Sequence, residues 1–313
     1  MTNSWQTTIQ QQHTLSNAQT INTESTFTPL PQLGLLKVTG DDSQSFLQSL
    51  LTNDVAELAV NQSQLTGFCN AKGRLFALFL LIRRQDAYQL VLPSSMCQLL
   101  LQRLSMYVLR AKVTITNETN NVALLSINNN DISHASTLGL NEDCYQSLAH
   151  NQCLCIIPKD KIEAVLSQFK ELNWSLNSEK TWNIGTIDTG LPMIFPETKE
   201  KFTPQQVNLD LVNGVSFKKG CYPGQEVVAR LHYLGSPSRR MFKAEIASTQ
   251  CPTVGDEIVN EAGNTAGHIV CSEMASDSLV KVLVSLKLSE RDAVLSTTDA
   301  IAVRLTDTNT PQE

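Results

Sequence analysis

The chemically richest stretch of the sequence is Lys219-Gly220-Cys221-Tyr222-Pro223-Gly224-Gln225-Glu226. An amine, a thiol, a phenol, an amide and a carboxylate lie within it, and its two glycines and proline predict a tight, rigid turn. The apolar run 214–217 before it predicts a buried strand, and residues 225–231 after it predict the start of a helix. A purely structural corner, with glycines chosen for packing, is the alternative interpretation.

Cys221 is the candidate catalytic residue of this stretch. Lys218 and Lys219 precede it and a helix N-terminus is expected just after it, and both features favour the thiolate. The alternative is that the thiol only fills a small apolar space beneath Tyr222. We expect all eight cysteines of the chain to be reduced. We also expect no metal site, because no second ligand pair accompanies Cys153 and Cys155.

Charge and hydropathy limit the classes of partner. The net charge is −6, which opposes tight non-specific binding of nucleic acid. One segment departs from this balance, because residues 217–243 hold six basic side chains against the single acid Glu226. Three interpretations are open for these basic residues: a site for an anionic ligand, a limited RNA contact, or a solvated face. The six are Lys218, Lys219, Arg230, Arg239, Arg240 and Lys243. No apolar run is long enough for a membrane span and no secretory signal is recognisable, so we expect a cytoplasmic protein.

The elements that position these residues follow from hydrophobic periodicity. Strands alternate with helices up to about residue 240, which predicts an α+β sheet covered by helices. Short runs of Val, Ile and Ala follow, and they predict a small β-barrel. Strands are expected at 33–40, 66–70, 75–82, 88–92, 112–116, 122–127 and 154–157, and helices at 42–52, 94–108 and 161–172. In the barrel, strands are expected at 241–246, 257–259, 266–272, 279–285 and 300–305, after a hinge at 235–238.

The 219–226 stretch resembles the signature of the YgfZ-type folate-binding proteins, which are relatives of the glycine-cleavage T-protein, an aminomethyltransferase. The residues from Val38 to Val55 and from Thr186 to Pro192 resemble further blocks of that superfamily. Residues 1–28 are rich in Gln, Thr, Asn and Ser and poor in apolar residues, so we expect a flexible segment there. The resemblance implies a T-protein-like folate-binding domain at 29–240. It also implies that this domain consists of two ferredoxin-like halves around a central channel, followed by a C-terminal β-barrel domain at 241–313.

The same resemblance implies tetrahydrofolate as the bound cofactor. It places Asp188 against the pterin ring, where one carboxylate offers two acceptor oxygens, and Trp182 beside the ring, where a flat indole suits stacking. The remaining residues that it implies for folate binding belong to the signature or follow it directly: Lys219, Tyr222, Gln225, Glu226 and Arg230. Two positions depart from the aminomethyltransferases: Leu78 stands where they carry an aspartate beside the folate, and Pro93 stands where they carry an asparagine.

The resemblance therefore implies a folate-binding accessory protein that supports iron–sulfur enzyme maturation or repair and tRNA modification. Leu78 leaves that position without a general acid or base, so we expect no classical turnover. A folate-dependent one-carbon transferase is the alternative, and a non-catalytic RNA-binding module that uses residues 218–243 is a third possibility. The expected partners of this monomer are tetrahydrofolate and iron–sulfur enzymes, including tRNA-modifying ones, with a weak tRNA contact and no membrane.

Overall fold

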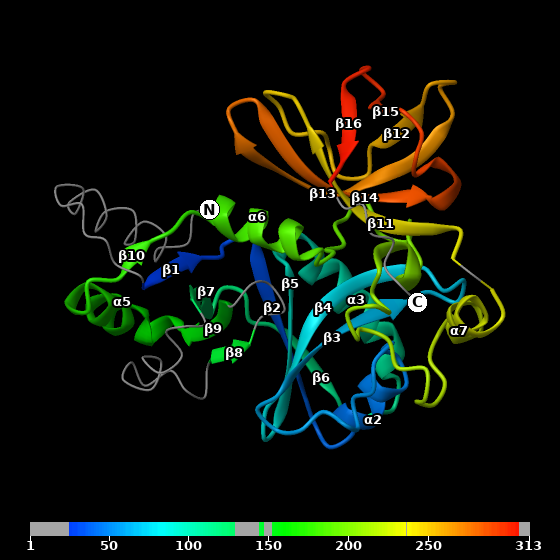
Figure 1. Ribbon diagram of the computed structural model, residues 1–313. Coiled ribbons are helices and arrows are strands. Elements are labelled where there is room, and N and C mark those ends of the chain that lie inside the picture. The colour runs from blue at the N-terminus through cyan, green and yellow to red at the C-terminus, as the bar shows by residue number, and fades with distance from the viewer. Residues whose placement is uncertain (1–24, 129–143, 147–151, 236, 307–313) are drawn as a thin grey trace.

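The computed structural model describes residues 25–128, 144–146, 152–235 and 237–306. It contains two five-stranded sheets and a closed barrel (Figure 1). Helices cover the sheets, so the predicted α+β class is confirmed. None of the helices in this described part of the chain is long and apolar enough to cross a membrane.

The first sheet comes from the N-terminal part of the chain and has the strand order β3-β4-β5-β2-β6. Helix α3 packs against it through Met96, Leu100 and Leu104, which recur at helical spacing. Gly73 has a φ of 69° and makes the turn between β3 and β4. The elements are β2 (Leu33–Thr39), α2 (Ser43–Gln48), β3 (Ser63–Cys69), β4 (Leu75–Arg83), β5 (Ala87–Pro93), α3 (Ser94–Val108) and β6 (Thr114–Asn117).

The second sheet has the strand order β10-β1-β7-β9-β8. Its strand β1 precedes β2 of the first sheet, so the chain passes between the two sheets and the halves are intertwined. Helix α5 packs on it, and the Phe169 ring stacks on those of Phe27 and Trp174 at 4.5 and 4.9 Å. The elements are β1 (Thr26–Pro29), β7 (Val122–Asn128), β8 (Cys144–Gln146), β9 (Gln152–Pro158), η2 (Lys159–Lys161), α5 (Ile162–Glu171) and β10 (Ser175–Leu176).

The alternation of side chains along β9 creates a layer between the two sheets. Cys153 and Cys155 face α5, whereas Leu154 and Ile156 join a second buried cluster that includes Val91 of the first sheet. Trp182 of α6 (Glu179–Thr189) belongs to this same cluster. The layer between the sheets is therefore closed on one side by α6.

The predicted barrel is confirmed, and it lies above α6 in the view of Figure 1. Six strands close it in the order β11-β14-β13-β12-β15-β16. Alternate residues such as Ile246, Val282 and Val284 fill its interior. The strands are β11 (Arg239–Ile246), β12 (Glu257–Asn260), β13 (Thr265–Ser276), β14 (Leu279–Lys287), β15 (Leu295–Thr297) and β16 (Ala302–Leu305), with the 3₁₀ turn η4 (Leu288–Glu290) after β14.

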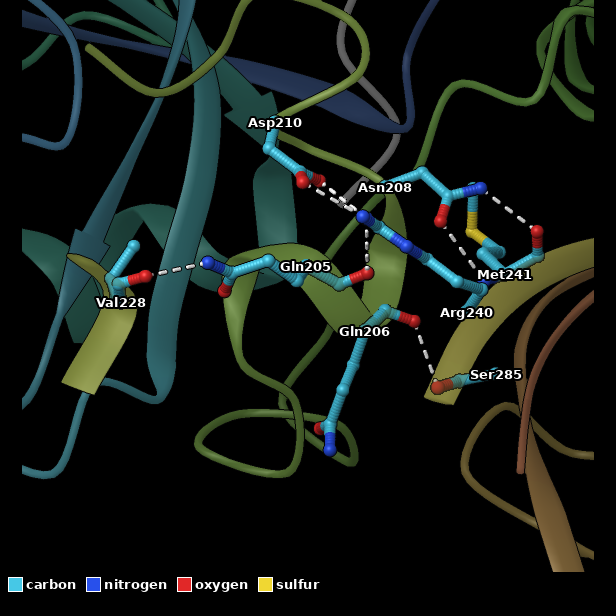
Figure 2. A network of polar contacts seen from close by, with 8 residues as sticks. All are labelled: Gln205, Gln206, Asn208, Asp210, Val228, Arg240, Met241 and Ser285. Atoms are coloured by element: carbon cyan, nitrogen blue, oxygen red, sulfur yellow. Dashed lines mark hydrogen bonds and ion pairs between the residues drawn. The ribbon is translucent and has the colours of Figure 1, made fainter. Parts of the chain in front are cut away.

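A polar clamp joins the barrel and the helix α7 (Gln225–Tyr233), and Figure 2 shows its residues. It is built on the 3₁₀ turn η3 (Pro204–Val207), whose Gln205 donates from Nε2 to the Val228 carbonyl at 2.7 Å. The guanidinium of Arg240 donates to both carboxylate oxygens of Asp210 at 2.8 and 2.9 Å, and both side chains are 8% exposed. Asn208 and the main chain of Met241 exchange two hydrogen bonds. The clamp therefore fixes α7 and the first barrel strand to one short segment.

Several sequence-based expectations differ from the structure. The helix expected at 42–52 ends at Gln48, and the run 214–217 is not a strand. Strand β15 was not expected, and β1 begins at Thr26, ahead of the predicted domain start. Cys155 forms a disulfide bond, so the prediction of eight reduced cysteines is wrong there. The predicted hinge at 235–238 includes position 236, which lies outside the described residues.

Candidate functional site

Helix α6 carries the side chains that border the space between the sheets. It begins with Glu179 in its first turn, where a carboxylate suits the helix dipole, and ends at Gly190 with a φ of 71°. Trp182 and Thr186 are four positions apart, so they share one face, and both are buried. This face looks toward the two sheets.

An apolar hollow of about 70 Å³ lies against this face of α6. Its walls come from both sheets and from the chain after α6. Trp182 and Thr186 contribute the helical wall, and the rest of the lining is Leu33, Leu65, Leu78, Phe79, Leu80, Val91, Leu92, Pro93, Leu154, Leu191, Pro192 and Met193. Both positions that depart from the aminomethyltransferases, Leu78 and Pro93, thus lie in this lining.

A second, larger hollow of about 240 Å³ adjoins the first and shares Leu33, Pro93, Thr186 and Met193 with it. It opens between α6 and the barrel, where Cys271 and Ser272 of β13 form part of its wall. Its lining is more polar than that of the first hollow, and its other members are Gln32, Glu179, Asn183, Ile187, Phe195 and Val254. We call the two together the joined hollow.

A chain of amide hydrogen bonds crosses the polar part of the joined hollow. Gln32 donates from Nε2 to Asn183 Oδ1 at 3.2 Å, and Asn183 donates from Nδ2 to Glu273 Oε2 at 2.8 Å. Glu179 lies one turn before Asn183 on α6 and borders the same hollow. Burial and the nearby Glu273 raise the pKa of Glu179, with the Asn183 side chain acting in the opposite direction.

Two buried polar atoms at the joined hollow have no hydrogen-bond partner among the described residues. They are the indole Nε1 of Trp182, a residue only 5% exposed, and the amide Oε1 of Gln32. A buried donor without an acceptor costs about 1–3 kcal/mol of stability, so its presence calls for an explanation. A ligand that supplies an acceptor to the indole and a donor to the amide oxygen is one.

Asp188, the residue expected to grip a pterin, does not line either hollow. Its two carboxylate oxygens accept hydrogen bonds from Lys281 Nζ on β14 at 2.7 and 2.8 Å. Its main-chain carbonyl accepts from Lys243 Nζ at 3.1 Å. The structure thus places Asp188 in an ion pair between α6 and the barrel, and its role toward a ligand stays a prediction.

The residues 217–224, which we call the signature loop, pack on the turn between β3 and β4. Gly224 has a φ of 78°, and a Cβ there would lie 2.4 Å from the Asn70 carbonyl oxygen and 2.5 Å from Gly73. Only glycine fits this approach of two backbones without displacing one of them. The first helical residue, Gln225, donates its main-chain N–H to the Tyr222 carbonyl at 3.1 Å.

Lys219 points inward from the signature loop and is only 7% exposed. Its Nζ donates to the carbonyl oxygens of Gln48, Leu51 and Asn53 at 2.7, 2.7 and 2.9 Å. These three bonds use all the donors of an ammonium group and cap the chain after α2. Burial lowers the pKa of Lys219 to about 8, against a smaller opposing effect of Asp54.

The other predicted site residues of this region differ in exposure. Tyr222 is buried, and its pKa is raised mainly by this burial and to a smaller extent by the neighbouring Cys69. Glu226 and Arg230 are exposed on α7, and Gln225 is half-buried. Cys221 is exposed, as is Cys251, whereas the free cysteines 69, 97, 153 and 271 are buried.

The structure does not bring the predicted site residues into one place. Trp182 and Asp188 lie on α6, beneath the barrel in Figure 1, whereas the others lie in the signature loop and α7, and α7 is at the right edge of that view. The six basic residues of 217–243 do not form one patch either, because Lys219, Arg240 and Lys243 are engaged by carbonyls or Asp210. Glu179, Asn183 and Gln32 were missed in the sequence. The signal for the first two was their helical spacing from Thr186 on α6, seven and three residues before it.

Comparison with known proteins agrees with this architecture. Residues 1–128 match the model of the GCVT N-terminal domain. The glycine cleavage system aminomethyltransferase T of Bartonella henselae superimposes with a TM-score of 0.72, covering 91% of this chain and 85% of its own, at 16% sequence identity. Fold and domain match thus define the class: the chain has the fold of an aminomethyltransferase and a GCVT N-terminal domain match over residues 1–128.

Similarity in sequence narrows this class to one family. The tRNA-modifying protein YgfZ of Aliivibrio fischeri strain MJ11 is 32% identical over 271 residues, which cover 83% of this chain and 85% of that protein. The protein of the same name from strain ES114 is 34% identical over the same shares. YgfZ of Colwellia psychrerythraea is 30% identical and covers 79% of this chain and 81% of its own length. The chain therefore belongs to the YgfZ family.

Proposed function

We propose that this chain binds a reduced folate in the joined hollow and acts as an accessory protein in tRNA modification, through iron–sulfur enzymes. The observation that carries the folate proposal is the unpartnered indole N–H of Trp182 at an apolar wall between two sheets. Support also comes from the fold, since the structural neighbour is an aminomethyltransferase. Support for tRNA modification comes from the name given to the YgfZ relatives.

The lining of the joined hollow fits the chemistry of a folate. A folate combines flat rings, which favour apolar and aromatic walls, with amide and amino groups, which need hydrogen-bond partners. Leu78, Pro93 and Leu154 offer such walls, Trp182 offers a donor and Gln32 an acceptor. Bound there, the folate would supply carriage of a one-carbon unit, while the chain's own residues bind it and exclude water.

The apolar wall supports a role without turnover. Leu78 lies in β4 with 4% of its surface exposed, and no acid or base belongs to the lining of the apolar hollow. Proton transfer to a folate in that hollow would need such a group within hydrogen-bond reach. We therefore favour binding over transfer. The transferase alternative predicts one-carbon transfer at rates on the order of 1 per second or faster.

Calorimetry with tetrahydrofolate tests the binding proposal. The wild-type chain is expected to show saturable binding, and Trp182→Phe is expected to weaken it by about 1–2 kcal/mol because the ring is kept but the donor is lost. Trp174→Phe is the matched control, since Trp174 packs on α5 away from the hollow. Absence of binding by the wild-type chain would refute the folate proposal.

The accessory role is tested separately, through the exposed thiol of the signature loop. We expect Cys221→Ser to lose tRNA methylthiolation in cells that lack a YgfZ-type protein, while its folate affinity is unchanged. Cys251→Ser is the control, because Cys251 is the other exposed free cysteine and burial followed by Glu273 raises its pKa. Cys221 should therefore also alkylate faster than Cys251 near neutral pH. Full methylthiolation with Cys221→Ser would exclude a role for this thiol.

A further inference from the structure

We infer that Glu179, together with Gln32, recognises a hydrogen-bond-donating ring at the polar part of the joined hollow, and that Asp188 does not. The ligand class is a flat nitrogen heterocycle that carries an amino group. This inference rests on the proposed function for the ligand's identity, since the pterin of a reduced folate is such a ring. Glu179 and Gln32 would then determine which part of the ligand lies in the polar hollow.

Glu179 lines the polar hollow from the first turn of α6. Glu179, Asn183 and Thr186 recur at intervals of four and three residues, so they share the face of α6 that borders the polar hollow. Trp182 extends this face into the apolar hollow. A single ligand in the joined hollow would thus meet an apolar wall and an indole at one end and a carboxylate at the other.

The hydrogen-bond inventory then fixes the polarity of the ligand group. Asn183 already has partners for both ends of its amide, because its Oδ1 accepts from Gln32 and its Nδ2 donates to Glu273. Glu273 accepts from Asn183 through one oxygen and from the main-chain N–H of Met274 through the other. At the polar hollow, the groups left to bind a ligand are acceptors: the Oε1 of Gln32, which has no partner among the described residues, and the carboxylate of Glu179. The unpartnered donor, the indole of Trp182, borders the apolar hollow instead.

Because the free groups at the polar hollow are hydrogen-bond acceptors, a ligand that fits them must donate hydrogen bonds. An anion, such as a phosphate or the glutamate tail of a folate, would meet repulsion from Glu179 and Glu273 at this end of the hollow. An amino group beside a ring N–H supplies two parallel donors, which is the pattern that a carboxylate binds best. The half-buried position of Glu179 strengthens such a bond, because little water competes for it.

Asp188 is placed less well for this contact. Both of its oxygens are hydrogen-bonded to Lys281, and it lines neither hollow. A ring bound at Asp188 would compete with Lys281 for an ion pair that joins α6 to β14. Glu179, in contrast, lines the polar hollow and can accept a donor there.

The test compares two amide variants on the same helix, Glu179→Gln and Asp188→Asn, by calorimetry with folinic acid, a stable reduced folate. We expect Glu179→Gln to weaken binding about ten- to a hundredfold, the usual effect of losing the charge from a hydrogen bond. Asp188→Asn is expected to stay within about twofold of the wild type, as removal of a group outside the site implies. Circular dichroism establishes that each variant is folded at the temperature of the titration.

A second ligand makes the test specific for the amino group. With an analogue of folinic acid that has hydrogen in place of the amino group, the wild type should bind weakly and Glu179→Gln should cost little more. The two losses are then not additive, which is the mark of a direct contact. Additive losses, or a loss confined to Asp188→Asn, would overturn the inference and leave the folate proposal intact.

Two further outcomes of these titrations have a different meaning. If the wild-type chain binds neither ligand, the proposed function fails, and the inference fails with it. If Glu179→Gln does not fold, Gln32→Met takes its place, because it removes the second acceptor from the other side of the hollow. It should weaken folinic acid about three- to tenfold, as loss of a neutral hydrogen bond does. An unchanged affinity in Gln32→Met would then overturn the inference.

Discussion

The inner face of α6 and the signature loop both carry polar side chains, but they use them in opposite ways. In the signature loop, Lys219 makes three hydrogen bonds to carbonyls and Gly224 packs backbone on backbone. On α6 and opposite it, Trp182 and Gln32 keep a buried donor and a buried acceptor without a partner among the described residues. Richness in reactive residue types therefore does not mark the place where capacity for a ligand remains.

This difference separates stability from binding in a measurable way. Residues whose hydrogen bonds are all made within the chain should affect unfolding and leave ligand affinity unchanged. Residues that hold unused capacity should do the reverse, since an unsatisfied buried group stabilises nothing until a ligand arrives. A substitution in the first group that changed ligand affinity, or one in the second group that lowered the free energy of unfolding, would contradict this contrast.

The largest loss of stability is expected from the clamp that holds α7 and the barrel together (Figure 2). Arg240→Met leaves the buried carboxylate of Asp210 without its cation, which typically costs about 3–5 kcal/mol. Arg304→Met is the control, because Arg304 is exposed on β16 of the same barrel. Urea unfolding measures both variants. A loss below about 1 kcal/mol for Arg240→Met would show that the clamp does not hold the domains together.

Alanine substitutions at the two glycines of the signature should differ in their effect on the free energy of unfolding. Gly224→Ala places a methyl group 2.4 Å from the Asn70 carbonyl oxygen in a left-handed residue, and we expect it to cost about 2–4 kcal/mol. Gly220→Ala meets no atom within 4 Å and should change the free energy of unfolding by less than about 0.5 kcal/mol. Equal effects of the two substitutions in thermal unfolding would contradict the packing described for Gly224.

The lowered pKa of Lys219 predicts that the stability of the folded chain depends on pH. Burial lowers its pKa to about 8 in the folded chain, whereas the unfolded chain keeps a value of about 10.4. Between these values the unfolded state binds a proton that the folded state does not, so raising the pH favours folding. We expect the stability of the wild type relative to Lys219→Met to rise by about 2 kcal/mol from pH 8 to pH 10.

The control for this titration is Lys218→Met, since Lys218 is the exposed neighbour of Lys219. Its stability relative to the wild type should not vary over the same pH range. A stability difference for Lys219→Met that stays flat or falls would mean that the three carbonyls, and not burial, determine the proton affinity of Lys219.

Local patterns predicted most of the fold. The hairpin of β3 and β4, the helix α3 and five of the barrel strands follow from periodicity and from glycine turns within a few residues. The elements that were wrong depend on distant partners. Helix α2 ends early where its carbonyls turn to Lys219, 171 residues further along the chain. The run 214–217 has one main-chain bond to Thr52 at Ser216, and no strand of the described chain pairs with it.

The candidate site could be predicted only in part for the same reason. Trp182 stands out in the sequence as a large aromatic residue, and it does line the hollow. Glu179 was not predicted because its surroundings come from Glu273, on a barrel strand, and from Gln32, which lies 151 residues from Asn183. Asp188 was assigned by resemblance, and the sequence near it gives no sign of Lys281, its partner 93 residues away.

The smallest effect expected is that of Glu179→Gln on the ligand-free chain, and its direction is the informative part. Because burial and Glu273 raise the pKa of Glu179, the folded state gains a proton before the unfolded state does. The wild type should therefore become more stable relative to Glu179→Gln as the pH falls from 7 toward 5. Asp188→Asn should lose up to about 1 kcal/mol at neutral pH, because it breaks a partly exposed ion pair. Chemical unfolding at two pH values measures both variants. A clear loss of stability for Glu179→Gln at neutral pH would make Glu179 a structural residue like Asp188, and the contrast between α6 and the signature loop would not hold.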